Sequence, residues 1–215
     1  MKYLVLVLVV VLFSTSAYSV TIVGSKHDFS SKGWGTTEIC QPCHAPHNNL
    51  NAAGTTLWNH QASTATYTMY KASSHNYQPN DGSLKCLGCH DGTVAVDSYG
   101  TRTGTNMMGS LSGGAATSLI GTDLSNDHPI SAAYPTSGTS YNAMTISTTG
   151  TSASVAYGSG STAGSLRLTL QTSGANSGKF TIECGTCHSA HNTAYEHMIK
   201  RDNTGSALCL TCHVK

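Results

Sequence analysis

Every cysteine of this chain belongs to one of four copies of the pattern C-x-x-C-H, which we number motifs 1 to 4 along the chain. C-x-x-C-H is the attachment signature of c-type haem: the two thiols become thioethers to the haem, and the histidine binds the iron as the proximal ligand. The four copies therefore predict four covalently attached haems. The predicted attachment cysteines are Cys40, Cys43, Cys86, Cys89, Cys184, Cys187, Cys209 and Cys212, and the proximal histidines are His44, His90, His188 and His213.

Two other uses of these cysteines compete with haem. Eight cysteines in an exported chain could form a disulfide framework, with about a hundred possible connectivities, and paired C-x-x-C could hold structural zinc. Neither explains why a histidine directly follows all four pairs while no cysteine is left over. Haem attachment accounts for both observations.

The N-terminus has the pattern of a secretory signal peptide. Lys2 is followed by the apolar run 4–13 and by small residues up to Ser19, so we predict cleavage after residue 19. The run is too short for a membrane anchor, and no cysteine follows that could carry a lipid. We expect the chain from Val20 onward to be released beyond the inner membrane, with no stable membrane insertion, where c-type haem is attached.

Charge and composition exclude some classes of protein. Without Lys2 the chain has ten basic and ten acidic residues, and the haem propionates add negative charge, so it lacks the basic footprint of a nucleic-acid binder. Only 10% of the residues are charged and 7% are aromatic, which is thin for a conventional core. We expect the haems to form the core.

The predicted fold class is a mostly irregular multihaem cytochrome, with short helices at the haem motifs and a few β-hairpins. The C-terminal motifs repeat the opening ones, which predicts an N-terminal di-haem unit (20–100) and a C-terminal one (180–215). Between them, 101–179 is rich in Gly, Ser and Thr and could be a disordered linker. Alternating apolar residues at 143–147 and 166–170 favour hairpins instead.

Catalysis at haem needs an open position on the iron, so the remaining histidines matter. His47 and His191 each lie three residues after a proximal histidine; on one helical turn the two rings cannot grip the same iron, so each would reach another haem. His27 and His128 stand in polar loops, where a solvated histidine is the ordinary alternative. His60 could be a ligand or a packed residue. His75 and His197 are expected to be bystanders.

The pieces flanking the motifs resemble a known family. Gly24-Ser-Lys-His27, Leu57-Trp58-Asn59-His60, the Asp-Gly-Thr-Val-Ala after His90, and His128-Pro-Ile-Ser are similar to tetrahaem cytochromes of metal-reducing bacteria. The likeness is closest to the extracellular cytochrome E type of Geobacter, whose subunits polymerise into nanowires. The chain departs from that pattern at Ala190, where proline is frequent, and around 145–164.

The resemblance implies a head-to-tail homopolymer in which a distal histidine of one subunit binds a haem of the next. It also implies His27, His47, His128 and His191 as the distal ligands, with His47 crossing between subunits. Upstream periplasmic or outer-membrane cytochromes would supply electrons, and extracellular acceptors such as metal oxides would receive them.

Three functions follow from these patterns. The first is a subunit of an extracellular conductive filament, and the second is a monomeric periplasmic electron shuttle. The third, a multihaem reductase, is disfavoured because enough histidines exist to close every iron, and we expect no enzymatic activity. A free shuttle usually docks through a charged patch, and this chain has no clustered run of charge. The sequence therefore favours the filament.

Overall fold

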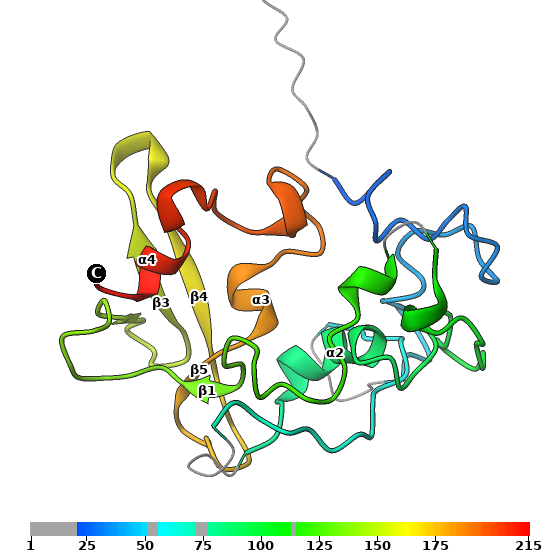
Figure 1. Cartoon of the computed structure of the whole chain (residues 1–215), viewed down its shortest axis with the longest axis horizontal. Coiled ribbons are helices and arrows are strands. Elements are labelled where there is room, and N and C mark those ends of the chain that lie inside the picture. The colour runs from blue at the N-terminus through cyan, green and yellow to red at the C-terminus, as the bar shows by residue number, and fades with distance from the viewer. Residues whose placement is uncertain (1–20, 51–55, 72–76, 113–114) are drawn as a thin grey trace, which may run out of the picture.

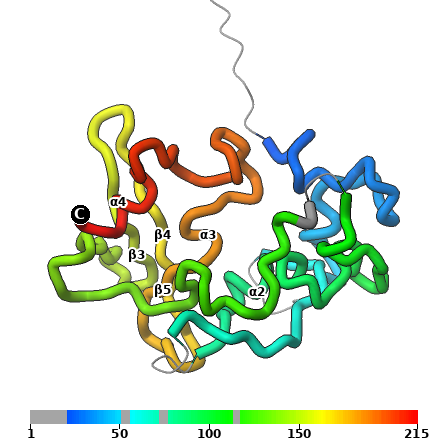
Figure 2. The backbone as a smooth tube through the Cα atoms, viewed as in Figure 1, coloured from blue at the N-terminus to red at the C-terminus, as the bar shows by residue number. Residues whose placement is uncertain are grey.

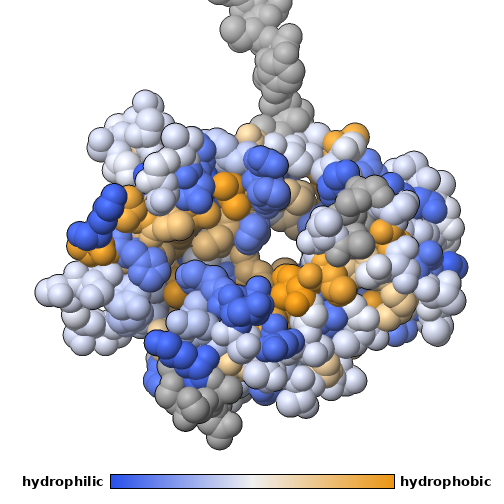
Figure 3. Space-filling model, in the orientation of Figure 1, coloured by the Kyte–Doolittle hydropathy of each residue, from blue (hydrophilic) through white to orange (hydrophobic). Residues whose placement is uncertain are grey.

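Most of the chain runs in turns and loops, as Figures 1 and 2 trace. The computed structural model describes residues 21–50, 56–71, 77–112 and 115–215. The predicted signal peptide and His75 lie outside these residues. Figure 1 shows two lobes, one built from the N-terminal part of the chain and one from the C-terminal part, and Figure 3 shows an opening between them.

The α-helices of the described residues all lie at haem motifs. Motif 2 ends helix α2 (Asp81–His90), motif 3 starts α3 (Cys184–Cys187), and motif 4 starts α4 (Cys209–Cys212). Motif 1 makes only one turn, in which His44 N–H donates to Cys40 C=O over 2.8 Å. Pro42 lies inside this motif, and proline both lacks an N–H and restricts the residue before it, which opposes a longer helix.

Short 3₁₀ turns connect these elements. They are η1 (Met108–Ser110), η2 (Ala115–Ser118), η3 (Gly160–Thr162), η4 (Glu196–Met198) and η5 (Thr204–Ser206). Two of them, η2 and η4, end next to proximal histidines and matter for the site. Within the described residues, no helix has the length and the hydrophobicity needed to cross a bilayer.

The C-terminal lobe contains an antiparallel sheet with the strand order β1-β5-β4-β3-β2. The strands are β1 (Ala132–Ala133), β2 (Thr145–Ile146), β3 (Ala153–Tyr157), β4 (Gly164–Leu170) and β5 (Phe180–Ile182). The alternating run at 166–170 lies in β4, whereas of the run at 143–147 only Thr145 and Ile146 form a strand, β2. The sheet crosses the predicted unit boundary at 179–180, because β5 leads directly into α3.

Each lobe has its own small apolar core. In β4, Leu166 and Leu168 are buried while Arg167 between them is exposed, which is the alternation of a strand with one covered face. Leu168 joins the cluster of the C-terminal lobe, against which Cys212 of motif 4 packs. The other cluster contains Leu87, which lies within motif 2. Attachment motifs are thus held directly by both cores.

Candidate haem-binding sites

In motif 1 a later segment of the chain, which we call the return segment, pairs with the residues around the proximal histidine. Residues 57–59 form an isolated antiparallel bridge with 43–45, through N–H···O bonds of 2.9 and 3.0 Å. The Nδ1 atom of His44 lies 2.6 Å from the carbonyl oxygen of Thr56, just before this bridge. An Nδ1–H that donates to a carbonyl leaves Nε2 unprotonated, which is the form that binds a metal.

Motif 3 repeats this arrangement. Residues 198–200 form a bridge with 187–189 through two N–H···O bonds of 2.8 Å. The Nδ1 atom of His188 lies 2.9 Å from the carbonyl oxygen of His197, again just before the bridge. The repeat seen in the sequence is therefore also a repeat of main-chain geometry.

The other two proximal histidines are held by more distant segments. His90 Nδ1 lies 2.9 Å from the carbonyl oxygen of Ser118, at the end of η2. His213 forms a bridge with Tyr141, and Val214 N–H donates to Ser140 C=O over 2.9 Å. Three proximal rings thus meet a carbonyl oxygen from outside their own motif, and the ring of His213 contacts that of Tyr141 instead.

Three of the predicted distal histidines face proximal ones. The ring centroids are 6.1 Å apart for His27 and His90, 6.0 Å for His44 and His191, and 6.3 Å for His128 and His213. Two metal–nitrogen bonds of about 2 Å, with the half-widths of two imidazoles, would separate the centroids by about 6 Å. The spacing therefore fits a bis-histidine iron between the rings of each pair.

The environment of His27 suits a neutral ligand. Burial, together with the neighbouring His90 and His191, lowers the pKa of His27 to about 4, although a hydrogen bond with the main chain of Ala190 opposes the shift. Neutral imidazole is the form that coordinates metals. In addition, some exposed apolar residues are tied to the chain at proximal histidines: Leu57 C=O accepts the N–H of Ala45, Ile120 N–H donates to His90 C=O, and Val214 directly follows His213.

The remaining proximal histidine, His188, and the remaining distal candidate, His47, are not paired with each other. His188 and His47 are both exposed, and among the described residues no other histidine ring is in contact with either of them. The pairing of His47 therefore stays a prediction.

His60, left open by the sequence, is almost completely buried. Its Nδ1 lies 2.8 Å from Gln61 O, and its Nε2 lies 3.1 Å from Ala95 O and 3.3 Å from Cys89 Sγ. Burial lowers its pKa, although hydrogen bonds to these carbonyls oppose the shift. Both ring nitrogens are engaged within its own lobe, which is the arrangement of a packed core histidine. His197 is exposed, with Nε2 3.5 Å from Glu196 Oε1.

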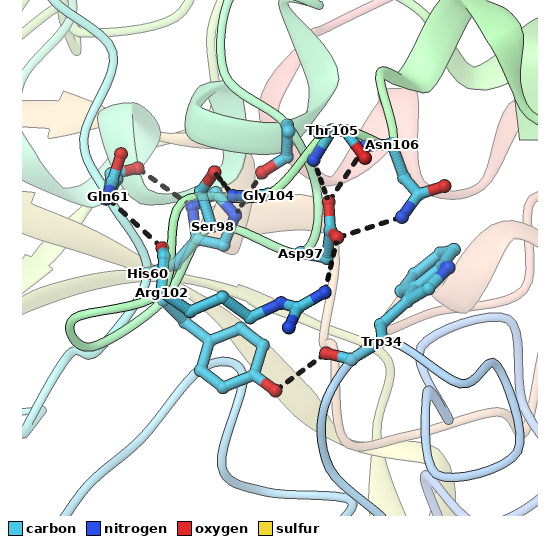
Figure 4. A network of polar contacts seen from close by, with 11 residues as sticks. Trp34, His60, Gln61, Asp97, Ser98, Arg102, Gly104, Thr105 and Asn106 are labelled. Atoms are coloured by element: carbon cyan, nitrogen blue, oxygen red, sulfur yellow. Dashed lines mark hydrogen bonds and ion pairs between the residues drawn. The ribbon is translucent and has the colours of Figure 1, made fainter.

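A buried carboxylate anchors the loop beside motif 1. Asp97 accepts the N–H groups of Thr105 and Asn106 at 3.0 and 2.9 Å, and Arg102 Nη2 at 3.2 Å (Figure 4). The next residues of the loop pair with the return segment of motif 1, since Gly100 N–H donates to the carbonyl oxygen at position 59 over 2.8 Å. Asp97 thus supports the bridge that orients His44.

All eight cysteines are free thiols, and the described residues contain no group of three or more His, Cys, Asp or Glu that could hold a metal ion. The neighbouring Cys86 thiol lowers the pKa of Cys184.

Sequence reasoning missed Glu183 and Asp97, both buried carboxylates that support the motifs. In a chain with so few charges, a glutamate directly before an attachment cysteine was the available signal for Glu183. The carbonyl oxygens that orient the proximal histidines have no side-chain signal at all.

A comparison with protein families matches the C-terminal part of the chain. Residues 177–215, which contain motifs 3 and 4, match the family model described as a doubled CXXCH motif. No curated protein matches the chain. The motifs and the paired histidines define a c-type haem protein, in which the haem is covalently bound. The doubled motif further indicates the multihaem cytochromes, a class that transfers electrons.

Proposed function

We propose that the chain binds four haems and carries electrons along them as the subunit of an extracellular conductive filament. The haem iron supplies the one-electron chemistry, and the protein supplies the axial histidines and the sulfur attachments. His27, His128 and His191 close three irons within one copy, opposite His90, His213 and His44. His47 of one copy binds the iron held by His188 of the next.

The observation that carries the proposal is that the rings of three predicted distal histidines contact proximal ones within the chain, whereas among the described residues the exposed His47 and His188 contact no other histidine ring. A contact in which His47 of one copy binds the haem of His188 in the next joins two different patches and is therefore heterologous. Such a contact repeats without closing and generates an open filament. The small number of charges suits a sheath around haems better than a docking shuttle.

The first test is electron microscopy of haem-containing material sheared from cells, with the protein identified by mass. We expect thin filaments containing this chain, and only dispersed copies in the periplasmic fraction would favour the shuttle. In His47→Ala, filaments should be lost while four haems remain attached.

Two matched variants make this test specific. His75→Ala removes a histidine outside the described residues, and His197→Asn removes an exposed one at a positive φ of 58°, which asparagine tolerates. Both should retain filaments. Loss of filaments in His75→Ala with retention in His47→Ala would assign the fourth ligand to His75 instead.

A second candidate function rests on the same exposed His188. If its iron stays without a sixth ligand, the protein can bind a small molecule there and act as a reductase. A high-spin signal from one haem in wild-type assembled material would favour that function, and a fully low-spin spectrum would exclude it.

A further inference from the structure

Glu183 lies directly before Cys184 and is 3% exposed. Its carboxylate is the acceptor of five side-chain donors from four separate segments. These are Ser83 Oγ, Ser131 Oγ at 2.9 Å, Asn80 Nδ2 at 3.1 Å, Gln171 Nε2 at 3.2 Å and Thr181 Oγ1 at 2.7 Å. Both carboxylate oxygens of Glu183 accept hydrogen bonds, as those of an ionised carboxylate do. Glu183 is therefore a buried negative charge that neutral side chains stabilise.

The donors to Glu183 come from both lobes. Asn80 and Ser83 belong to the start of α2, which carries motif 2, whereas Thr181 belongs to β5, which leads into motif 3. Ser83 Oγ also accepts the N–H of Cys184 at 3.2 Å. The side chain thus joins the helix of one haem site to the helix of the next, and α2 and α3 are in contact.

Attachment cysteines of both motifs lie beside this network. Cys184 N–H donates to Ser83 Oγ, and Cys86 Sγ lies 3.9 Å from the carbonyl oxygen of Gly82, so the second and third haem sites adjoin at the start of α2. No ion pair to Glu183 occurs among the described residues. A negative charge without a cationic partner near an iron stabilises the oxidised, more positive state and lowers the reduction potential.

We propose that Glu183 is a positioning residue that holds the second and third haem sites in contact and lowers the reduction potential of both haems. The proposal rests on the four-haem reading above and names a residue that tunes electron transfer within one copy. It does not depend on filaments, because both effects arise inside a single chain.

The test compares Glu183→Gln with Glu38→Gln in the haem-loaded protein. Glu38 is the matched control because it is exposed and lies just before motif 1. In a spectroelectrochemical titration of dispersed protein, Glu183→Gln should move half of the haem to higher potential and leave the other half unchanged. Glu38→Gln should leave the whole curve unchanged. An unchanged curve in Glu183→Gln, or an equal shift of all the haem, would overturn the proposal.

Ser83→Ala provides a second readout if Glu183→Gln fails to mature. It removes one donor and the acceptor of Cys184 N–H without changing the net charge. The circular dichroism couplet in the Soret band, which reports contact between haems, should weaken while the potentials stay near those of the wild type. An unchanged couplet would refute the positioning role. Fewer than four haems in the wild-type protein, measured by mass, would instead refute the four-haem function.

Discussion

Motifs 1 and 3 have the same local structure and opposite surroundings. In both, a return segment pairs with the residues around the proximal histidine, and the carbonyl just before the bridge meets its Nδ1 atom. The histidine three places on then behaves differently. Both side chains are exposed, but the ring of His191 contacts that of His44, whereas among the described residues His47 contacts no other histidine ring.

The local structure of the motif therefore orients the proximal ring. The tertiary surroundings determine what the histidine three residues later contacts. Motif 3 follows the buried Glu183 and is tied to α2 by it. Motif 1 follows the exposed Glu38 and has no such tie. One repeat is used to close the subunit, and the other is free for a neighbouring copy under the proposed function.

The largest effect is expected for His191→Ala. Removing this histidine should leave the iron of His44 without its second ligand and separate the two lobes at that site. We expect a high-spin signal from one haem and a loss of about 4 kcal/mol in the free energy of unfolding, as for other lost metal ligands. Electron paramagnetic resonance and thermal unfolding measure the two effects.

The control for His191→Ala is His47→Ala studied as dispersed protein. Because His47 is exposed and, unlike His191, contacts no other histidine ring among the described residues, its removal should change the unfolding free energy of a single copy by no more than about 0.5 kcal/mol. Equal destabilisation by the two variants would contradict the view that only the third motif closes the subunit.

A smaller effect is expected from weakening the loop that holds a return segment in place. For motif 1, Asp97 anchors this loop. Asp97→Asn removes a buried charge that accepts two main-chain N–H groups and Arg102, so we expect a loss of about 2 kcal/mol. Denaturant unfolding would measure it. Asp202→Asn, on the exposed side of the C-terminal lobe, should have no measurable effect.

The pH dependence of Asp97 follows from the same contacts. Burial alone would raise the pKa of its carboxyl, but hydrogen bonds from Asn106 and Arg102 outweigh burial and lower it. Its contribution to stability is therefore complete above the unfolded pKa of about 4 and is lost as the pH falls through the lower folded value. Asp97→Asn should remove this part of the acid destabilisation, and a titration curve identical to the wild type would contradict the assignment.

The sequence could predict what depends on neighbouring residues. The attachment motifs are local, and the alternation of Leu166, Arg167 and Leu168 follows from the two faces of a strand. The contact of His191 with His44 joins residues far apart in the chain, so spacing indicated only that His191 reaches another haem. The burial of Glu183 depends on donors from both lobes, which no local pattern contains.

The smallest expected effect concerns the return segment of motif 3, which continues into Arg201. The Arg201 guanidinium lies 4.4 Å from the centre of the Tyr157 ring in β3, and its Nη1 donates to Thr211 Oγ1 over 2.6 Å. Arg201→Lys keeps the charge but loses the planar stacking and the directed hydrogen bond, which should cost about 1 kcal/mol.

A double-mutant cycle with Tyr157→Leu separates the stacking from the hydrogen bond. We expect a coupling of about 0.5–1 kcal/mol between the two positions in thermal unfolding, because each single change removes the same contact. Strictly additive effects would mean that Arg201 acts through Thr211 alone. In that case Arg201 would tie the return segment of motif 3 to motif 4 and not to the sheet. The sheet would then contribute less to the orientation of the third haem site than to that of the fourth.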